Sequence, residues 1–269
     1  MSKPIPQFGF GTWNHPEDET YRIVAQALEI GYRHIDTAEM YGNERAVGRA
    51  IRESGLKRDE VFITTKVPPD AYGKGQIIKH AKASMEKLGV EQADLYLLHW
   101  PSPGDQYDAH DYGAQLGGVL DAKLARQIGV SNFTRKYMDI AFEVLGDRPI
   151  ATNQVECHVL MQNRPIVDYC KAKNIPITAY CPLARGRLSN HEGLKAIAAK
   201  HNATPEQVGL AFLMAEGLIV IPSSSKRERI QSNWDAQKVK LSADEIAQIR
   251  KMHENKRLVD GAWCPKWDT

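Results

Sequence analysis

Short apolar runs rich in β-branched and aromatic residues recur along the chain and alternate with longer segments of helical periodicity. Eight such runs occupy residues 8–13, 32–38, 61–67, 94–100, 127–133, 151–156, 176–182 and 218–224. Strands that alternate with helices imply right-handed crossovers and a parallel sheet, and eight such units close into a barrel. The pattern therefore predicts an α/β fold of the (β/α)8 or TIM barrel type.

Local signals mark the ends of several predicted helices. Asp18 precedes a helical run that Gly31 ends, which predicts an N-cap and a C-terminal glycine. Thr204 stands at the N-cap position of a later helix, directly before a proline. Ser242 opens a capping box and a last helical pattern over 242–254, which lies outside the eightfold repeat. We therefore expect an extra C-terminal helix, followed by a tail without clear periodicity.

The length of the chain fits one such barrel. It has 269 residues, close to the typical size of about 250 for this fold. No linker or low-complexity tract divides the sequence, so residues 1–269 are predicted to form a single domain. No interface signature stands out, and a monomer is expected.

Composition excludes several classes of partner. The formal net charge of +2 gives no reason to expect nucleic acid or an anionic membrane surface. The four cysteines lie far apart without a CxxC pair, which indicates neither a disulfide framework nor a zinc ribbon. The most apolar segment, 208–222, is too short for a membrane span and contains Glu216, and the N-terminus lacks the apolar core of a signal peptide. A cytoplasmic location is the simplest expectation.

Candidate chemistry gathers where the predicted strands end, because the carboxyl ends of parallel strands face one mouth of a barrel. The polar residues delivered there are Asp36, Tyr41, Lys66, His99, Ser131, Asn132, Gln154 and Tyr180. Each has a simpler interpretation when taken alone: Lys66 as a solvated charge, His99 as a core histidine, Asp36 as a helix cap. The joint pattern favours a site.

Four of these groups suit the protonation of a carbonyl oxygen. We expect the Lys66 ammonium to lower the pKa of Tyr41 so that this phenol can act as general acid. Asp36 would keep Lys66 protonated and oriented, and His99 would position the substrate oxygen. No metal-binding motif or nucleophile elbow is present. Reduction would then need a hydride from a cofactor.

A glycine fingerprint for a dinucleotide is absent, because the GFG at 9–11 lacks the third glycine. A better anion site follows the eighth strand, where Ser223, Ser224 and Ser225 lead into the basic segment from Lys226 to Asn233. Serines at a helix N-terminus with cations in the first turn can bind phosphate. The alternative is a solvated basic helix start.

Several motifs together resemble the aldo-keto reductases: HIDTAEMYGNE, ITTKV, DLYLLHWP, IGVSNF, NQVE, AYCPL and IPSSSKRERIQSN. They appear in order over nearly the whole chain. The resemblance implies a barrel that reduces carbonyl compounds with NADPH, through a tetrad of Asp36, Tyr41, Lys66 and His99. Within the family, the short chain is most similar to the bacterial 2,5-diketo-D-gluconate reductase B type, which also reduces methylglyoxal.

The same resemblance assigns binding residues. The implied cofactor contacts are Ser131, Asn132, Gln154, Tyr180, Pro182, Leu183, Ser223, Ser224, Ser225, Lys226, Arg229 and Asn233, and the implied substrate contacts are Trp13, Tyr41, His99 and Trp100. Tyr180 would stack on the nicotinamide ring. The tail tryptophans, Trp263 and Trp267, are candidates for the pocket wall or for simple packing.

Two departures from the family pattern stand out. Ser223 replaces the lysine that commonly follows the strand-eight proline, so Lys226, Arg227 and Arg229 would have to supply the charge for a cofactor phosphate. The N-terminus leaves little room for the hairpin that usually covers the barrel bottom, so other contacts must cover it.

The short loop after His99 and the modest tail favour an open pocket for small polar substrates. A nucleotide-binding regulatory barrel with little turnover is the alternative function, and the intact tetrad argues against it.

Overall fold

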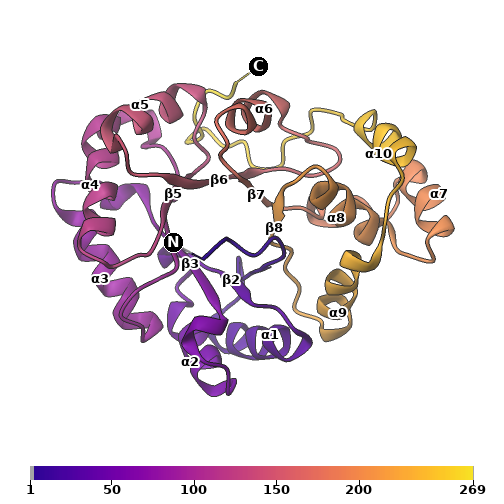
Figure 1. Cartoon of the computed structure of the whole chain (residues 1–269), viewed down its shortest axis with the longest axis horizontal. Coiled ribbons are helices and arrows are strands. Elements are labelled where there is room, and N and C mark those ends of the chain that lie inside the picture. The colour runs from indigo at the N-terminus through magenta and orange to yellow at the C-terminus, as the bar shows by residue number, and fades with distance from the viewer. Residues whose placement is uncertain (1–2, 269) are drawn as a thin grey trace.

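The computed structural model describes residues 3–268 and confirms the predicted barrel (Figure 1). Eight parallel strands pair in chain order within one sheet. The strands are β1 (Phe10–Gly11), β2 (His34–Asp36), β3 (Phe62–Val67), β4 (Leu95–Leu98), β5 (Ile128–Ser131), β6 (Ile150–Glu156), β7 (Ile177–Tyr180) and β8 (Ile219–Val220).

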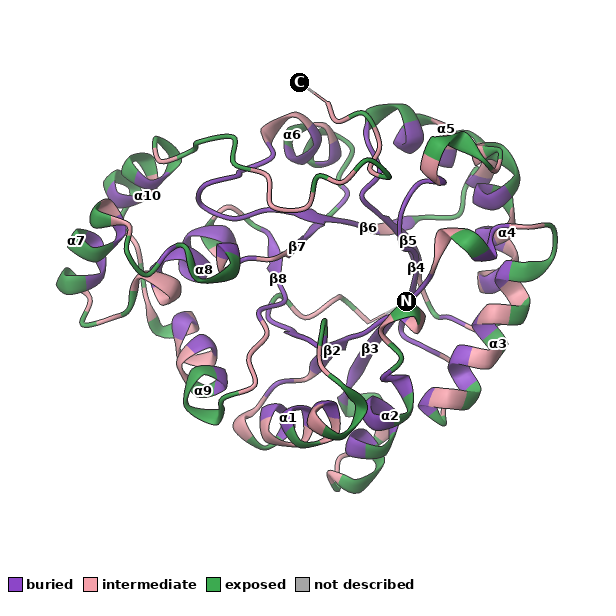
Figure 2. Ribbon diagram, turned by 180° about the vertical axis from the view of Figure 1, so that it is seen from behind, coloured by how far each residue is buried: buried purple, intermediate pink, exposed green. Residues whose placement is uncertain are grey.

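Helices surround this sheet, and their buried faces turn toward the strands (Figure 2). They are α1 (Glu17–Ile30), α2 (Glu44–Glu53), α3 (Gln76–Leu88), α4 (Ala109–Asp121), α5 (Arg135–Leu145), α6 (Arg164–Ala172), α7 (Glu192–Lys200), α8 (Pro205–Ala215), α9 (Arg227–Asp235) and α10 (Ala243–Arg250). The additional C-terminal helix is confirmed as α10. Within the described residues, no helix has both the length and the apolar character that a membrane crossing needs.

The barrel closes between its first and last strands. The amide of Gly9 donates to the carbonyl of Val220 at 2.8 Å, and the amide of Val220 donates to the carbonyl of Gln7 at 2.9 Å. The eighth strand is shorter than predicted because it ends at Val220, two residues before Pro222. Proline has no amide hydrogen to donate, although the Pro222 carbonyl still accepts from the amide of Gly11 at 3.1 Å. The chain beyond it is irregular and free to follow the rim of the barrel.

The N-terminal segment covers the bottom of the barrel. Ile5 packs against an interior cluster of Phe62, Leu95 and Leu97. The side-chain amide of Gln127 donates to the main chain of this segment, at the carbonyl of Lys3, over 2.8 Å. An extended segment of the chain therefore covers this end of the barrel.

Most of the predicted helix ends are confirmed. Thr204 and Ser242 each form a complete capping box, and α1 ends at Gly31 with φ 128°. The prediction of Asp18 as an N-cap is wrong. The helix begins two residues earlier, with Pro16 in the extended N-cap position, and Asp18 lies in the first turn, where a carboxylate favours the helix dipole.

The contact between α2 and α3 depends on Gly48. A Cβ atom at this position would lie 2.0 Å from the carbonyl oxygen of Leu88. We expect Gly48→Ala to reduce the free energy of unfolding by about 3 kcal/mol, because two helix backbones must separate. Urea denaturation measures this change. Gly118→Ala is the control, since its Cβ would meet only the flexible end of Ile78 at 3.2 Å; equal losses in the two variants would contradict the packing explanation.

Candidate active site

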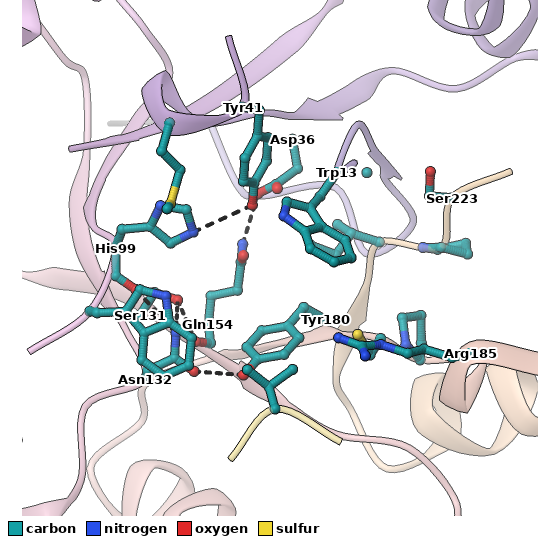
Figure 3. Close-up of a pocket in the computed structure, with 18 of the residues that line it drawn as sticks. Trp13, Asp36, Tyr41, His99, Ser131, Asn132, Gln154, Tyr180, Arg185 and Ser223 are labelled. Carbon is teal, nitrogen blue, oxygen red and sulfur yellow. Dashed lines mark hydrogen bonds between the residues drawn. The ribbon is translucent and has the colours of Figure 1, made fainter. Parts of the chain in front are cut away.

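A cavity of about 470 Å³ opens at the carboxyl ends of the strands (Figure 3). Its lining includes most of the residues predicted for the site: Trp13, Asp36, Tyr41, His99, Trp100, Ser131, Asn132, Gln154, Tyr180, Pro182, Leu183 and Ser223. Lys66 lies below its floor. The remaining predicted residues lie outside the cavity lining: Ser224, Ser225 and Lys226 in the segment that leads into α9, and Arg229 and Asn233 in α9 itself.

A buried ion pair lies at the floor of the cavity, where Asp36 lines the cavity and Lys66 does not. The Nζ atom of Lys66 donates to Oδ1 of Asp36 at 2.6 Å and to the carbonyl of Thr37 at 2.8 Å. Nε2 of Gln154 donates to the other oxygen of Asp36 at 2.7 Å. Burial lowers the pKa of Lys66, and the carboxylate of Asp36 acts in the opposite direction. Both carboxylate oxygens are occupied, so Asp36 holds Lys66 in one orientation.

Tyr41 and His99 lie above this pair and face each other. The Tyr41 hydroxyl is 3.4 Å from Nε2 of His99, and Nζ of Lys66 is 5.2 Å from the centre of the Tyr41 ring. Burial lowers the pKa of His99 well below its ordinary value, and the charge of Lys66 lowers it further, so the imidazole is neutral. Its Nδ1 atom is buried without a partner among the described residues. Because an unpaired buried N–H is rarer than an unpaired acceptor, the proton belongs on Nε2, toward the cavity.

The pKa of Tyr41 corrects one expectation. Burial raises it well above the usual tyrosine value, and the charge of Asp36 raises it further. The net shift of the Tyr41 pKa is therefore opposite to the expected lowering, because burial and the Asp36 carboxylate both raise it. The phenol keeps its proton at neutral pH.

A hydrogen-bonded row extends from His99 along the ends of three strands. The side-chain amide of Asn132 donates to the carbonyl of His99 at 3.1 Å and to the hydroxyl of Ser131 at 3.0 Å. Its oxygen accepts from the Tyr180 hydroxyl at 2.8 Å. Oε1 of Gln154 has no partner among residues 3–268. The row thus combines an aromatic ring with amide groups that line one wall.

The serines after β8 are fixed by local contacts. The Ser223 hydroxyl lies 2.9 Å from Nε2 of His15, which comes from the loop after β1. The Ser224 hydroxyl accepts from the amide of Lys226 at 3.2 Å, just before α9 begins. The loops after the first and last strands are therefore tied together beside the cavity.

The cations of this segment are not equivalent. Arg227 makes a bidentate ion pair with Glu29 of α1, at 2.7 and 3.0 Å, and so does not supply free charge. Lys226 and Arg229 form no ion pair within residues 3–268. Asn233 is buried two turns into the helix. Of the three cations considered for a cofactor phosphate, Lys226 and Arg229 remain available.

Comparison with known proteins shows to which family the chain belongs. The sequence profile of the aldo/keto reductase family matches residues 7–254. The chain belongs to this family. This aldo/keto reductase is 45% identical to methylglyoxal reductase DkgB of Escherichia coli O157:H7, over 98% of this chain and 99% of that one. It is 42% identical to 9,11-endoperoxide prostaglandin H2 reductase of Trypanosoma cruzi, over 94% and 90%.

Solved structures agree. A 2,5-diketo-D-gluconic acid reductase B superposes with a TM-score of 0.93 at 35% identity, covering 98% of this chain and 94% of that chain. The aldose reductase of Schistosoma japonicum gives 0.90 at 31% identity, covering 96% and 91%. The family resemblance predicted from the motifs is confirmed.

Some pocket residues of this aldo/keto reductase had no signal in the sequence analysis. Met40, Cys181, Arg185 and Val259 line the cavity, but none was assigned a role, although Met40 and Cys181 stand within the motifs HIDTAEMYGNE and AYCPL. Trp263, a candidate for the pocket wall, also lines it and meets the Trp100 ring edge-on at 4.5 Å between centroids. Within residues 3–268 no cluster of three or more His, Cys, Asp or Glu side chains is placed to hold a metal ion.

Proposed function

We propose that this protein reduces small aldehydes and ketones to alcohols with NADPH, and that Tyr41 donates the proton. Family membership supports carbonyl reduction in general. The observation that carries the proposal is the position of the Tyr41 hydroxyl, which faces the cavity between neutral His99 and the buried pair of Lys66 and Asp36.

The wall of the cavity fits a nicotinamide. Tyr180 offers an aromatic face there, and its hydroxyl is held by Asn132. Oε1 of Gln154 is an unpaired acceptor on the same wall, suited to the N–H groups of a carboxamide. Lys226 and Arg229 provide the free charge that a phosphate needs. When bound, NADPH supplies the hydride.

The residues of the chain supply the remaining steps. The N–H of His99 donates a hydrogen bond that places the substrate oxygen beside the Tyr41 hydroxyl. Tyr41 then transfers its proton to that oxygen as negative charge develops on it. The ammonium of Lys66, 5.2 Å from the Tyr41 ring centre, stabilises the phenolate that remains. Asp36 and Gln154 keep the ammonium in place.

The direct test is oxidation of NADPH by the purified protein in the presence of a carbonyl panel. We expect turnover with methylglyoxal and 2,5-diketo-D-gluconate, read as loss of nicotinamide absorbance and formation of the alcohol. Tight NADPH binding without turnover on any carbonyl would overturn the proposal in favour of a regulatory barrel.

Preference for NADPH is expected to depend on Arg229. Arg229→Ala should raise KM for NADPH about tenfold and leave KM for NADH nearly unchanged, because one charge-assisted contact is lost. Steady-state kinetics with both cofactors measure this. Arg227→Ala is the matched control, since that guanidinium is already bound to Glu29. Equal effects of the two variants would count against a role for Arg229 in phosphate binding.

A further inference from the structure

The C-terminal tail builds part of the substrate cavity. Val259 and Trp263 line it, and Trp263 packs on Trp100, the residue after His99. Trp263 is 47% exposed; the other large hydrophobic residues this open to solvent among residues 3–268, Trp13 and Met40, also line the cavity. The family match ends at residue 254. The tail wall therefore lies outside the part of the chain that the family profile covers.

A buried carboxylate ties the main chain of the tail to the barrel, in addition to the contacts of Arg257 with Asn163 and of Asp268 with Arg135. Glu156, the last residue of β6, accepts the amide of Leu258 at 2.7 Å and the amide of Val259 at 2.9 Å. Nε2 of His158 lies 3.1 Å from the same carboxylate, and both side chains are fully buried. Within residues 3–268, the main chain of residues 257–263 makes no other hydrogen bond to the barrel.

The ionised form of Glu156 is the one that can accept all of these bonds. Burial is the largest influence and opposes ionisation, but the hydrogen bonds from His158, Leu258 and Val259 outweigh it, so the pKa of Glu156 lies below its ordinary value. A carboxylate that accepts two amides and an imidazole has few lone pairs left unused. This contact is much more specific than the surrounding apolar packing.

Glu156 also shares strand β6 with Gln154, a residue that contacts the buried ion pair. Gln154, two residues earlier on β6, donates to Asp36. Residues i and i+2 of a strand project to the same face. Strand β6 therefore presents Gln154 to the ion pair and Glu156 to the tail. The strand thereby contacts both the tail and the ion pair that lies beside Tyr41.

We propose that Glu156 is a positioning residue for substrate selection, holding Val259 and Trp263 as an apolar wall against which the apolar or aromatic body of a carbonyl substrate packs. This inference rests on the proposed carbonyl reduction. The wall contributes only when the substrate has such a body, so a compact carbonyl gains little from it.

The test compares Glu156→Gln with the wild-type protein on two substrates, 4-nitrobenzaldehyde and methylglyoxal. Glutamine keeps the shape but places an N–H2 donor against donors. We expect the ratio of kcat/KM for 4-nitrobenzaldehyde to that for methylglyoxal to fall about tenfold, and the amides of Leu258 and Val259 to exchange hydrogen faster. A purely structural role would instead lower both activities in proportion and leave the ratio unchanged, which would overturn the proposal.

Two further variants keep the result decisive. Trp263→Ala should lower the same ratio without faster exchange at Leu258 and Val259, and an unchanged ratio here would also overturn the proposal. Glu254→Gln is the matched control, because that carboxylate lies on the surface and, among residues 3–268, forms an ion pair only with Lys256, at 2.8 Å. Its ratio should equal that of the wild type.

The proposed function and the proposed wall can fail separately. If the wild-type protein reduces no carbonyl, the proposed function is wrong. The wall is then tested by titrating the protein with 4-nitrobenzaldehyde and following the quenching of tryptophan fluorescence. Glu156→Gln and Trp263→Ala should each weaken the apparent affinity for this aldehyde about tenfold. Unaltered quenching in both variants would refute the wall itself.

Discussion

Tyr41→Phe is expected to lower kcat for methylglyoxal by a factor of about 10² to 10⁴, the range that general acid catalysis contributes. Phenylalanine keeps the ring beside Lys66 but removes the hydroxyl that faces His99. The affinity for NADPH should stay within a factor of two. Stopped-flow measurement of hydride transfer and a fluorescence titration with NADPH separate these two effects.

The matched control is Tyr21→Phe, which removes a hydroxyl bonded to Glu53 on the outer helices. Near wild-type turnover in Tyr41→Phe would eliminate this tyrosine as the proton donor.

The pH dependence of activity provides a second check on Tyr41. Tyr41 must be protonated to act as the donor, and burial raises its pKa well above the ordinary tyrosine value. A rise in pH near neutrality should therefore not deprotonate it. A loss of activity between pH 7 and 8 that is absent in Tyr41→Phe would contradict this.

Lys66→Met is expected to reduce both activity and stability. Activity should fall by a factor of about 10² to 10³, because the charge that stabilises the phenolate is lost. The free energy of unfolding should fall by about 3–5 kcal/mol, because Asp36 is left as a buried carboxylate without its cation. Urea denaturation and steady-state kinetics measure the two losses.

A double variant distinguishes the causes. In Asp36→Asn combined with Lys66→Met, no buried charge remains unpaired, so most of the lost stability should return. Activity should not return, because the ammonium is still missing. Recovery of turnover together with stability would show that Lys66 serves the fold and not the reaction.

The barrel was predictable because each strand is a short apolar run bounded by turn residues, and parallel pairing follows from the intervening helices. The same reasoning placed Asp36, Lys66 and His99 at one rim, since their positions depend only on where strands end. The pKa of Tyr41 was not predictable in this way. It depends on how deeply the ring is buried and on how close the Asp36 carboxylate lies, and both are properties of the packed site.

The tail and the segment after β8 show a second limit. Residues 255–268 have no regular period, so nothing local indicates that Val259 reaches the cavity. Its position depends on long-range contacts, chief among them the carboxylate of Glu156 in β6, which accepts the Val259 amide. Likewise, the sequence shows Arg227 as a free cation, whereas Glu29, far away in the chain, pairs with it. Such contacts depend on tertiary structure and carry no local sequence signal.

The closure of the barrel through Gln7, Phe8 and Val220 has a consequence for the nascent protein. The segment synthesised first pairs with a strand that leaves the ribosome near the end of translation. Until then, the first and seventh strands have no partner on one edge, and exposed strand edges invite pairing with other chains. A molecule truncated before Val220 should therefore aggregate or be held by chaperones, even though seven of its eight strands are complete.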